Sequence, residues 1–184
     1  MFLVYLTLGG WALLEMGLRV SERVHHRGGG DRDRGTRILI VLTLGAAFGL
    51  APLVASAAPS LRIPGPYRAV GLIVMGLGLA IRIWAIAVLG NAFRTTVEVD
   101  PGQRVVSTGP YEWVRHPSYT GLLLIMSGFG LAEGSWLALA ACTVVPLPAL
   151  LWRIQVEEAE LNRVLGDAYR AYQTHTKRLI PGLW

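Results

Sequence analysis

The sequence predicts an all-α integral membrane protein with about five transmembrane helices. Hydrophobic residues make up 53% of the 184 positions and charged residues only 16%, with a mean hydropathy of +0.46. A soluble domain of average composition carries about 25% charged residues. The charges here gather between long apolar stretches, as they do in membrane proteins. The length leaves room for one membrane domain, residues 1–184, without a separate soluble domain.

Five apolar stretches account for the predicted helices. Residues 2–20, 38–58 and 69–89 are each long enough to cross the hydrocarbon core, which takes about 20 helical residues. The first lacks a basic leader segment and a small-residue cleavage site, so we interpret it as a mature helix and not as a signal peptide. The fourth stretch, 119–132, is short, and the fifth, 135–152, contains two prolines. With Glu133-Gly134 as a tight turn, these two are expected to form a kinked helical hairpin.

The arginines predict the orientation in the membrane. Six lie around the loop between the first two spans: Arg19, Arg23, Arg27, Arg32, Arg34 and Arg37. The positive-inside rule places this loop in the cytoplasm. With five spans the N-terminus is then outside, and residues 90–118 and the C-terminal tail are cytoplasmic.

The sequence pI near 9.9 does not indicate a nucleic-acid partner. The basic residues lie beside the spans, where they contact anionic lipids, and no nucleic-acid motif is present. No obligate protein partner is indicated. The single cysteine, Cys142, lies in an apolar run and is interpreted as inert core, with no disulfide or cysteine-based metal site.

The segment after the third span carries the densest polar and aromatic cluster. Alternation in 95–99, a turn at 100–103 and an extended run at 104–106 predict a small β-hairpin. The run that ends in Arg-His-Pro-Ser-Tyr places His116 just before Pro117, so the imidazole is expected outside the N-terminus of the fourth helix. Such a terminus favours an anion. Tyr111 and Tyr119 supply rings that can stack on a ligand, whereas Trp113 is interpreted as an interfacial anchor.

Arg153 and Glu157 share one helical face near the membrane boundary. Charges that are partly removed from water need partners or ligands, which favours a role in binding over an ordinary surface pair. Gly166 is expected to end this helix. The aromatic tail, 178–184, is expected to fold back against the membrane. Arg82 and Glu15 lie within spans, and their functional and structural interpretations both stay open.

These motifs together resemble the isoprenylcysteine carboxyl methyltransferase and phospholipid methyltransferase superfamily. The resemblance runs from residue 91 to the end of the chain and includes Gly109-Pro110-Tyr111, Arg115-His116-Pro117-Ser118-Tyr119, Glu157-Glu158 and Pro181-Gly182. It implies a membrane enzyme that uses S-adenosyl-L-methionine without a Rossmann domain. The cytoplasmic loop and the C-terminal helical segment of 90–184 would enclose the cofactor. A lipophilic substrate would enter from the bilayer, in a pocket shaped by the three spans of 1–89.

The resemblance also assigns roles by position. Cofactor contacts fall on Gln103, Val105, Val106, Tyr111, His116, Tyr119 and Glu157, with Thr96 as a further position. Arg153 falls on the substrate side as the catalytic and substrate-binding residue. Gln103 departs from the pattern, since eukaryotic protein methyltransferases have histidine there. No metal is implied.

Three functions are weighed against one another. Besides the methyltransferase, an NADPH-dependent membrane enzyme similar to sterol reductases would share the Arg-His-Pro-x-Tyr region, but the chain is short for that class. A non-enzymatic membrane scaffold is disfavoured by the ionisable residues gathered in two cytoplasmic segments. The methyl acceptor stays open among a prenylated cysteine, an amino phospholipid, a phenol and a thiol. If it is a carboxylate, Arg153 could position it with two parallel hydrogen bonds.

Overall fold

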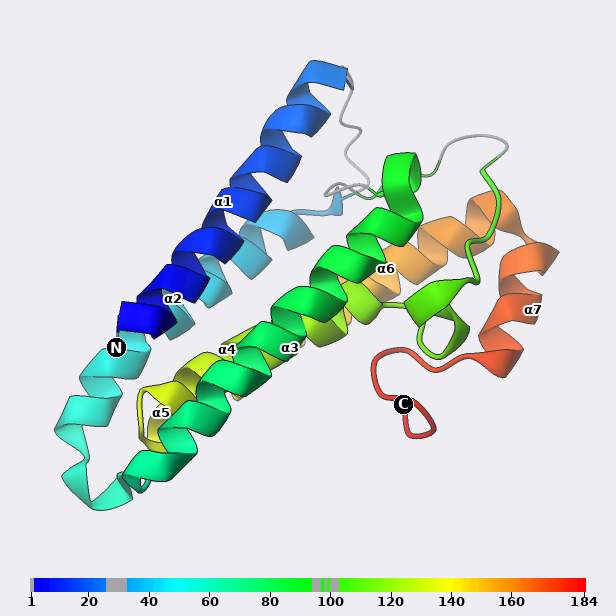
Figure 1. Ribbon diagram of the computed structural model, residues 1–184. Helices are drawn as coiled ribbons and strands as arrows, with labels where there is room; N and C mark the ends of the chain where they lie inside the picture. Colours follow the sequence, from blue (N-terminus) through cyan, green and yellow to red (C-terminus); the bar gives the residue numbers. More distant parts are fainter. Residues whose placement is uncertain (1, 26–32, 94–96, 98, 100–102) are drawn as a thin grey trace.

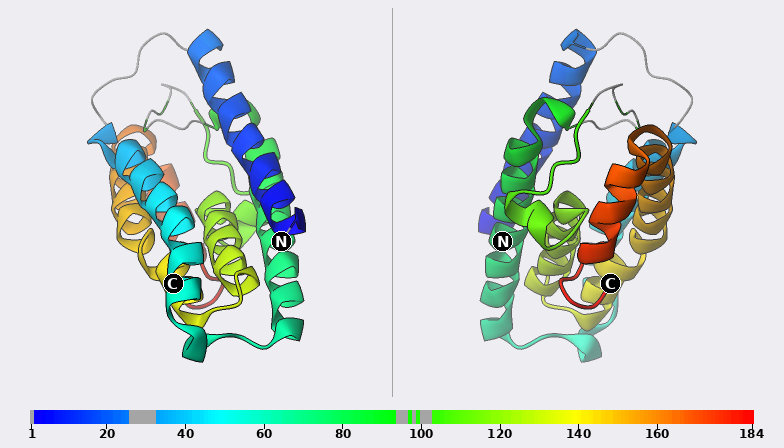
Figure 2. Two further views of the ribbon diagram at one scale, coloured as in Figure 1. Left: turned by 90° about the vertical axis from the view of Figure 1, so that its left-hand side faces the viewer. Right: turned by 90° about the vertical axis from the view of Figure 1, so that its right-hand side faces the viewer.

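The protein is a bundle of α-helices in the part of the chain that its computed structural model describes, residues 2–25, 33–93, 97, 99 and 103–184 (Figure 1). The helices are α1 (Phe2–His25), α2 (Thr36–Ala57), α3 (Gly65–Leu89), α4 (Pro117–Ala132), α5 (Trp136–Val144), α6 (Leu147–Leu165) and α7 (Asp167–His175). Short 3₁₀ turns cover Pro59–Leu61, Gly90–Ala92 and Gly109–Glu112. The last residue of α1, the first of α2 and the last of α3 lie at one end of the bundle (Figure 2).

Three helical stretches of the described residues are long and apolar enough to cross a membrane: Thr36–Ala57, Gly65–Leu89 and Trp136–Leu165. α4 is a shorter apolar helix. α1 extends to His25, beyond the predicted boundary at residue 20, and is not one of the three. The all-helical membrane fold is confirmed, whereas the number of five spans stays a prediction.

The predicted hairpin of the last two apolar stretches is present. Gly134, with φ 77°, lies in the turn between α4 and α5, a backbone conformation that glycine adopts without steric cost. The second arm is divided, because α5 ends at Val144 and α6 begins at Leu147 with a proline in its first turn. Proline lacks the N–H that a continuous helix needs, but it is well suited to a helix start.

α3 and α4 make the most extensive helix contact of the fold. They cross through glycines: a Cβ atom on Gly78 would lie 2.6 Å from the carbonyl oxygen of Gly121, and one on Gly128 would lie 2.6 Å from the backbone nitrogen of Met75. The close packing expected of glycines in a span is therefore present at Gly78. Gly76 has no atom within 4 Å of a Cβ position and takes no part in it.

One buried apolar cluster joins α1, α2, α3, α4, α5 and α6. Its members are Val4, Leu44, Ala47, Ala51, Met75, Leu122, Met126, Phe129, Ala132, Ala138, Cys142 and Leu150. Cys142 is a free, fully buried thiol packed near Ala47, as predicted. This core packs together the helices that carry the site described next.

The C-terminal residues fold back and contact the segment before α4. Gly166, with φ 56°, ends α6 as predicted, and α7 follows. The backbone N–H groups of Arg115 and His116 then donate to the carbonyl oxygens of Lys177 and Arg178 at 2.7 and 3.0 Å. The expected contact of the tail with the membrane stays a prediction.

The predicted β-hairpin is not formed by the described residues. Val97, Val99 and residues 103–106 have no strand structure, and the rest of the first arm lies outside the described residues. Alternating apolar and polar residues predict a strand only where a neighbouring strand completes the hydrogen bonds. Here these residues lie along the cavity described next.

Candidate active site

A cavity of about 680 Å³ lies at the polar end of the bundle. This volume is within the range of about 300–1,000 Å³ that small-molecule sites occupy. Every described residue that the sequence assigned to a site lines it: Gln103, Val105, Val106, Tyr111, His116, Tyr119, Arg153 and Glu157. Thr96 lies outside the described residues. Two segments that are distant in the sequence, the loop before α4 and the helix α6, thus meet at one cavity.

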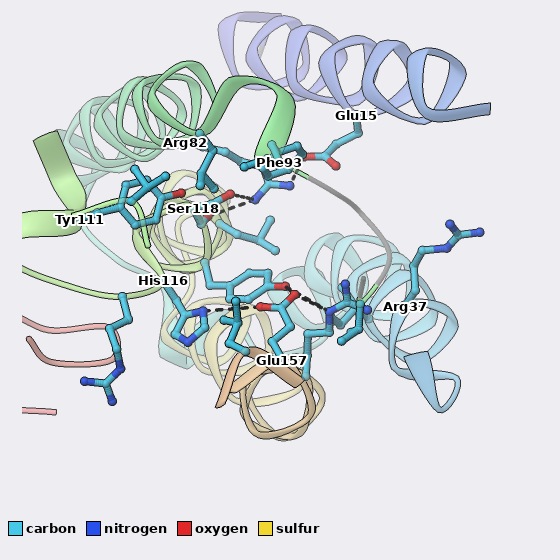
Figure 3. Close-up of a pocket in the computed structure, with 18 of the residues that line it drawn as sticks. Glu15, Arg37, Arg82, Phe93, Tyr111, His116, Ser118 and Glu157 are labelled. Carbon is cyan, nitrogen blue, oxygen red and sulfur yellow. Dashed lines mark hydrogen bonds and ion pairs between the residues drawn. The ribbon is translucent and has the colours of Figure 1, made fainter. Parts of the chain in front are cut away.

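The cavity has two chemically different walls. α1 and α2 supply an apolar wall with the side chains of Trp11, Met16, Ile40, Val41, Leu44 and Phe48. The loop before α4, α4 itself and α6 supply a polar wall (Figure 3). A ligand with a charged end and an apolar chain would find a matching surface for each part.

Glu157 is at the centre of the polar wall. Its Oε1 accepts hydrogen bonds from Nε of Arg153 at 2.7 Å and from the hydroxyl of Tyr119 at 2.5 Å. Its Oε2 lies 3.5 Å from Nδ1 of His116. The pairing of Arg153 with Glu157, four residues apart on α6, is as predicted. Tyr119 and His116 come from the start of α4, so this carboxylate links α6 to α4.

His116 lies between two carboxylates. Besides the contact with Glu157, its Nε2 lies 3.3 Å from Oε1 of Glu158. Burial lowers the pKa of His116, but hydrogen bonds and charge interactions with Glu157 and Glu158 outweigh it and raise the pKa above its usual value. The ring stacks on Tyr119, with centroids 5.7 Å apart. The raised pKa favours the protonated imidazole, which lies at the N-cap of α4, the place where the sequence predicted it.

Glu158 holds the surrounding segments together. It accepts hydrogen bonds from Nε of Arg115 at 2.8 Å and from Nε of Arg178 at 3.0 Å. Arg115 also donates to the carbonyl oxygen of Thr176. The loop before α4 and the C-terminal segment are thus both bound to the same carboxylate on α6. Apart from the neighbouring Glu157-Glu158 of the resemblance, no pattern in the sequence predicted these pairings.

Tyr111 is fixed by two hydrogen bonds. Its hydroxyl donates to the carbonyl oxygen of Ala85 at 3.3 Å, and its own carbonyl oxygen accepts from the hydroxyl of Tyr172 at 2.6 Å. Burial raises the pKa of Tyr172 to about 12, so this phenol remains a donor near neutral pH. Tyr169 and Tyr172, three residues apart on α7, both line the cavity.

Arg153 has two further partners that the sequence analysis missed. Its Nη1 contacts the carboxylate of Asp33 and lies 3.1 Å from the hydroxyl of Thr36, a fully buried residue at the start of α2. No local pattern identifies Arg153 as the partner, because it lies 117 residues beyond Thr36.

A second buried arginine, Arg82 of α3, also faces the cavity. Its Nη2 lies 2.5 Å from Oε1 of Glu15 on α1, and its Nη1 donates to the hydroxyl of Ser118 at 2.7 Å (Figure 3). The sequence left both charged residues open. They form an ion pair, and with the Ser118 contact of Arg82 it joins α1, α3 and α4.

The chain was compared with known protein families and proteins. A family model described as phospholipid methyltransferase matches residues 67–168. The protein-S-isoprenylcysteine O-methyltransferase of Tribolium castaneum is 32% identical over 114 residues, which are 61% of this chain and 41% of that protein. The corresponding enzyme of Schizosaccharomyces pombe is 29% identical over 117 residues, 62% of this chain and 50% of that one. The uncharacterized protein YpbQ of Bacillus subtilis is 30% identical over 82 residues, 45% and 49% of the two chains.

The chain therefore spans about half the length, or less, of these curated relatives. Among solved structures, the eukaryotic intramembrane Ras methyltransferase, an isoprenylcysteine carboxyl methyltransferase, matches with a TM-score of 0.66 and 27% identity. The match covers 78% of this chain and 52% of that one. This likeness and the three long apolar helices show an integral membrane protein.

The predicted resemblance to this superfamily is confirmed. The segment matched by the family model is more than half of the chain and contains the polar wall from Tyr111 to Glu157. It leaves out α1 and α2, which build the apolar wall. The chain belongs to the phospholipid methyltransferase family.

Proposed function

We propose that the protein transfers a methyl group from S-adenosyl-L-methionine to a lipophilic acceptor at the cytoplasmic side of the membrane. The observation that carries the proposal is one cavity with a polar wall inside the family-matched segment and an apolar wall outside it. The names of the relatives, which are isoprenylcysteine methyltransferases, support methyl transfer. The arginines between the first two helices support the orientation.

The polar wall fits the cofactor by its chemistry. A methionine end carries an ammonium and a carboxylate, and the wall offers the carboxylate of Glu157 beside the imidazole of His116 at the start of α4. Tyr111 offers a ring for an adenine, and Val105 and Val106 offer apolar contact. Gln103 lines the same cavity and would complete the adenosine end. When bound, the group supplies an electrophilic methyl on a sulfonium.

The protein's own contribution is alignment and exclusion of water. Methyl transfer is an in-line displacement, so its rate depends on holding the acceptor at the correct distance and angle. Arg153 orients Glu157 and Tyr119 through its Nε. The apolar wall of α1 and α2 would hold the acceptor's chain and keep water from the reacting atoms. In this proposal Arg153 lies on the acceptor side and Glu157 on the cofactor side.

The test is ligand-induced stabilisation of the purified protein. S-adenosylhomocysteine at a hundredfold excess over its dissociation constant should stabilise the folded state by about 2.7 kcal/mol. NADPH at the same concentration should not shift the thermal midpoint. Asp167→Asn, which changes an exposed acid on α7, is the control variant and should respond to each ligand as the wild type does. Stabilisation by NADPH alone would favour a reductase, and no shift with either ligand would favour a scaffold.

A further inference from the structure

Arg153 lines the cavity and contacts two carboxylates: Glu157, which also lines it, and Asp33, which lies before α2. The Arg153 side chain is only 2% exposed, whereas those of Asp33 and Glu157 are 20% and 19% exposed. A ligand that reaches Arg153 from the cavity therefore meets a guanidinium that already has two acidic partners.

Asp33 is a fixed part of this arrangement. Its Oδ2 accepts a hydrogen bond from the backbone nitrogen of Arg37 at 3.1 Å, and its Oδ1 accepts from the hydroxyl of Thr36 at 3.3 Å. These contacts cap the first turn of α2, a role in which an acidic side chain stabilises a helix. A carboxylate held at a helix start in this way is not a loose group that an incoming ligand would simply displace.

Both sides of the guanidinium are engaged. Nε donates to Glu157, and Nη1 donates to Asp33 and Thr36. A substrate carboxylate binds arginine best through two parallel hydrogen bonds along one edge of the fork. Either edge that contains Nε or Nη1 already has an acidic partner, and a third carboxylate would add like-charge repulsion at short distance. Arg153 is thus poorly placed to receive an anionic acceptor.

We infer that Asp33 determines the acceptor class: it excludes acceptors whose reacting end is an anion and favours an uncharged or cationic one, such as a hydroxyl, thiol or amine. The inference rests on the proposed function and deepens it. Asp33 lies outside residues 67–168, the segment matched by the family model. The acceptor can therefore differ from that of the solved carboxyl methyltransferase without a change in the family-matched segment.

The experiment compares two amphiphiles that differ only in charge. N-acetyl-S-farnesylcysteine and its carboxamide are titrated, without cofactor, into the purified full chain in an uncharged detergent, and the apparent dissociation constants are read from thermal stabilisation. The variants are wild type, Asp33→Asn and Asp33→Ser, which both keep a capping oxygen, and Asp167→Asn as the control for loss of a surface charge. S-adenosylhomocysteine is titrated separately into each variant.

The wild type and Asp167→Asn should bind the carboxamide more tightly than the carboxylate. In Asp33→Asn and Asp33→Ser, affinity for the carboxylate should rise by about tenfold or more, a factor equal to about 1.4 kcal/mol, with the carboxamide affinity unchanged. Equal binding of both probes to wild type, no gain in the Asp33 variants, or no binding of either probe would overturn the inference. So would a loss of S-adenosylhomocysteine binding in the Asp33 variants, since Asp33 would then belong to the cofactor site. Failure of S-adenosylhomocysteine to bind even the wild type would refute the proposed function instead, and the two-probe comparison would still be readable.

Discussion

The two walls of the cavity differ in where their charges come from. On the polar wall the partners are close in sequence or lie within the family-matched segment, as for Arg153 with Glu157 and His116 with Glu158. Two acids of the N-terminal part of the chain pair with arginines of this segment: Glu15 of α1 pairs with Arg82, and Asp33 before α2 pairs with Arg153. Arg82 and Arg153, two buried arginines of the family-matched segment, therefore each have an acidic partner from outside it, and Arg153 has Glu157 inside it as well. The family-matched segment and the N-terminal part of the chain are joined at these two arginines.

The largest effect is expected at the centre of the polar wall. Glu157→Ala removes the shared acceptor of Arg153, Tyr119 and His116. Truncating one member of a buried, hydrogen-bonded charged pair costs about 2–5 kcal/mol or more in binding. Stabilisation by S-adenosylhomocysteine should disappear while the protein still elutes as a folded species in size-exclusion chromatography. If Glu157→Ala retained normal affinity, the cofactor would not contact this carboxylate.

The matching change on the other wall should affect stability and spare cofactor binding. Glu15→Ala leaves the buried guanidinium of Arg82 without its carboxylate, and breaking a buried pair in this way costs about 3–5 kcal/mol. We expect a marked fall in the thermal midpoint, partly restored in the double variant Glu15→Ala/Arg82→Met. If the folded fraction of Glu15→Ala bound S-adenosylhomocysteine less tightly than the wild type does, the ion pair of Glu15 and Arg82 would contribute to cofactor binding as well as to stability.

Arg153→Lys should separate binding from turnover. Lysine keeps the charge but lacks the planar fork that engages Glu157, Tyr119 and Asp33 together. Misplacement of a positioning group by about 1 Å can cost about 100-fold in rate. The rate of methyl transfer to a suitable acceptor should fall by that order, with S-adenosylhomocysteine affinity nearly unchanged. Equal losses of rate and of affinity would move Arg153 to the cofactor side.

A smaller effect should follow from crowding α3 against α4, which carries the polar wall. Gly78→Ala would place a Cβ atom 2.6 Å from the carbonyl oxygen of Gly121, whereas Gly76→Ala meets nothing within 4 Å. Overpacking of this kind costs about 1–3 kcal/mol. Only Gly78→Ala should lose thermal stability. A similar loss in Gly76→Ala would show that the effect comes from replacing a glycine within α3 and not from crowding where α3 crosses α4.

The smallest expected effect is a pH dependence from His116. Its pKa in the folded protein is raised, so the stability from its contacts with Glu157 and Glu158 is complete below the unfolded pKa of about 6.5. That contribution is lost as the pH rises through the higher folded value. The thermal midpoint of the wild type should therefore decline as the pH rises from about 6.5 through the folded pKa of His116. His116→Gln should remove this part of the slope, and an unchanged slope would assign it to other groups.

Local spacing predicted parts of the polar wall: residues four apart on a helix share a face, as Arg153 and Glu157 do, and a histidine before a proline lies at a helix start, as His116 does. The assignment of these residues to one site came from the resemblance, since His116 and Glu158 lie 42 residues apart. The helices and the turn at Gly134 followed from hydropathy and from glycine and proline chemistry. The contributions of Asp33 and Glu15 could not be predicted, because their arginines lie 120 and 67 residues away and helix pairing is not encoded in local spacing. Residues 103–106, one arm of the predicted hairpin, have no strand structure, and most of the other arm lies outside the described residues.

The contact between the C-terminal residues and the segment before α4 has a consequence for biosynthesis. The backbone N–H of His116 donates to Arg178, and Glu158 joins Arg115 to Arg178 across the same junction. During translation, the backbone of His116 gains its hydrogen bond to Arg178 only after residues near 178 have left the ribosome and folded back. If the proposed function is right, a chain that stops before these residues holds the polar wall without this junction, and it should bind a methyl donor less tightly.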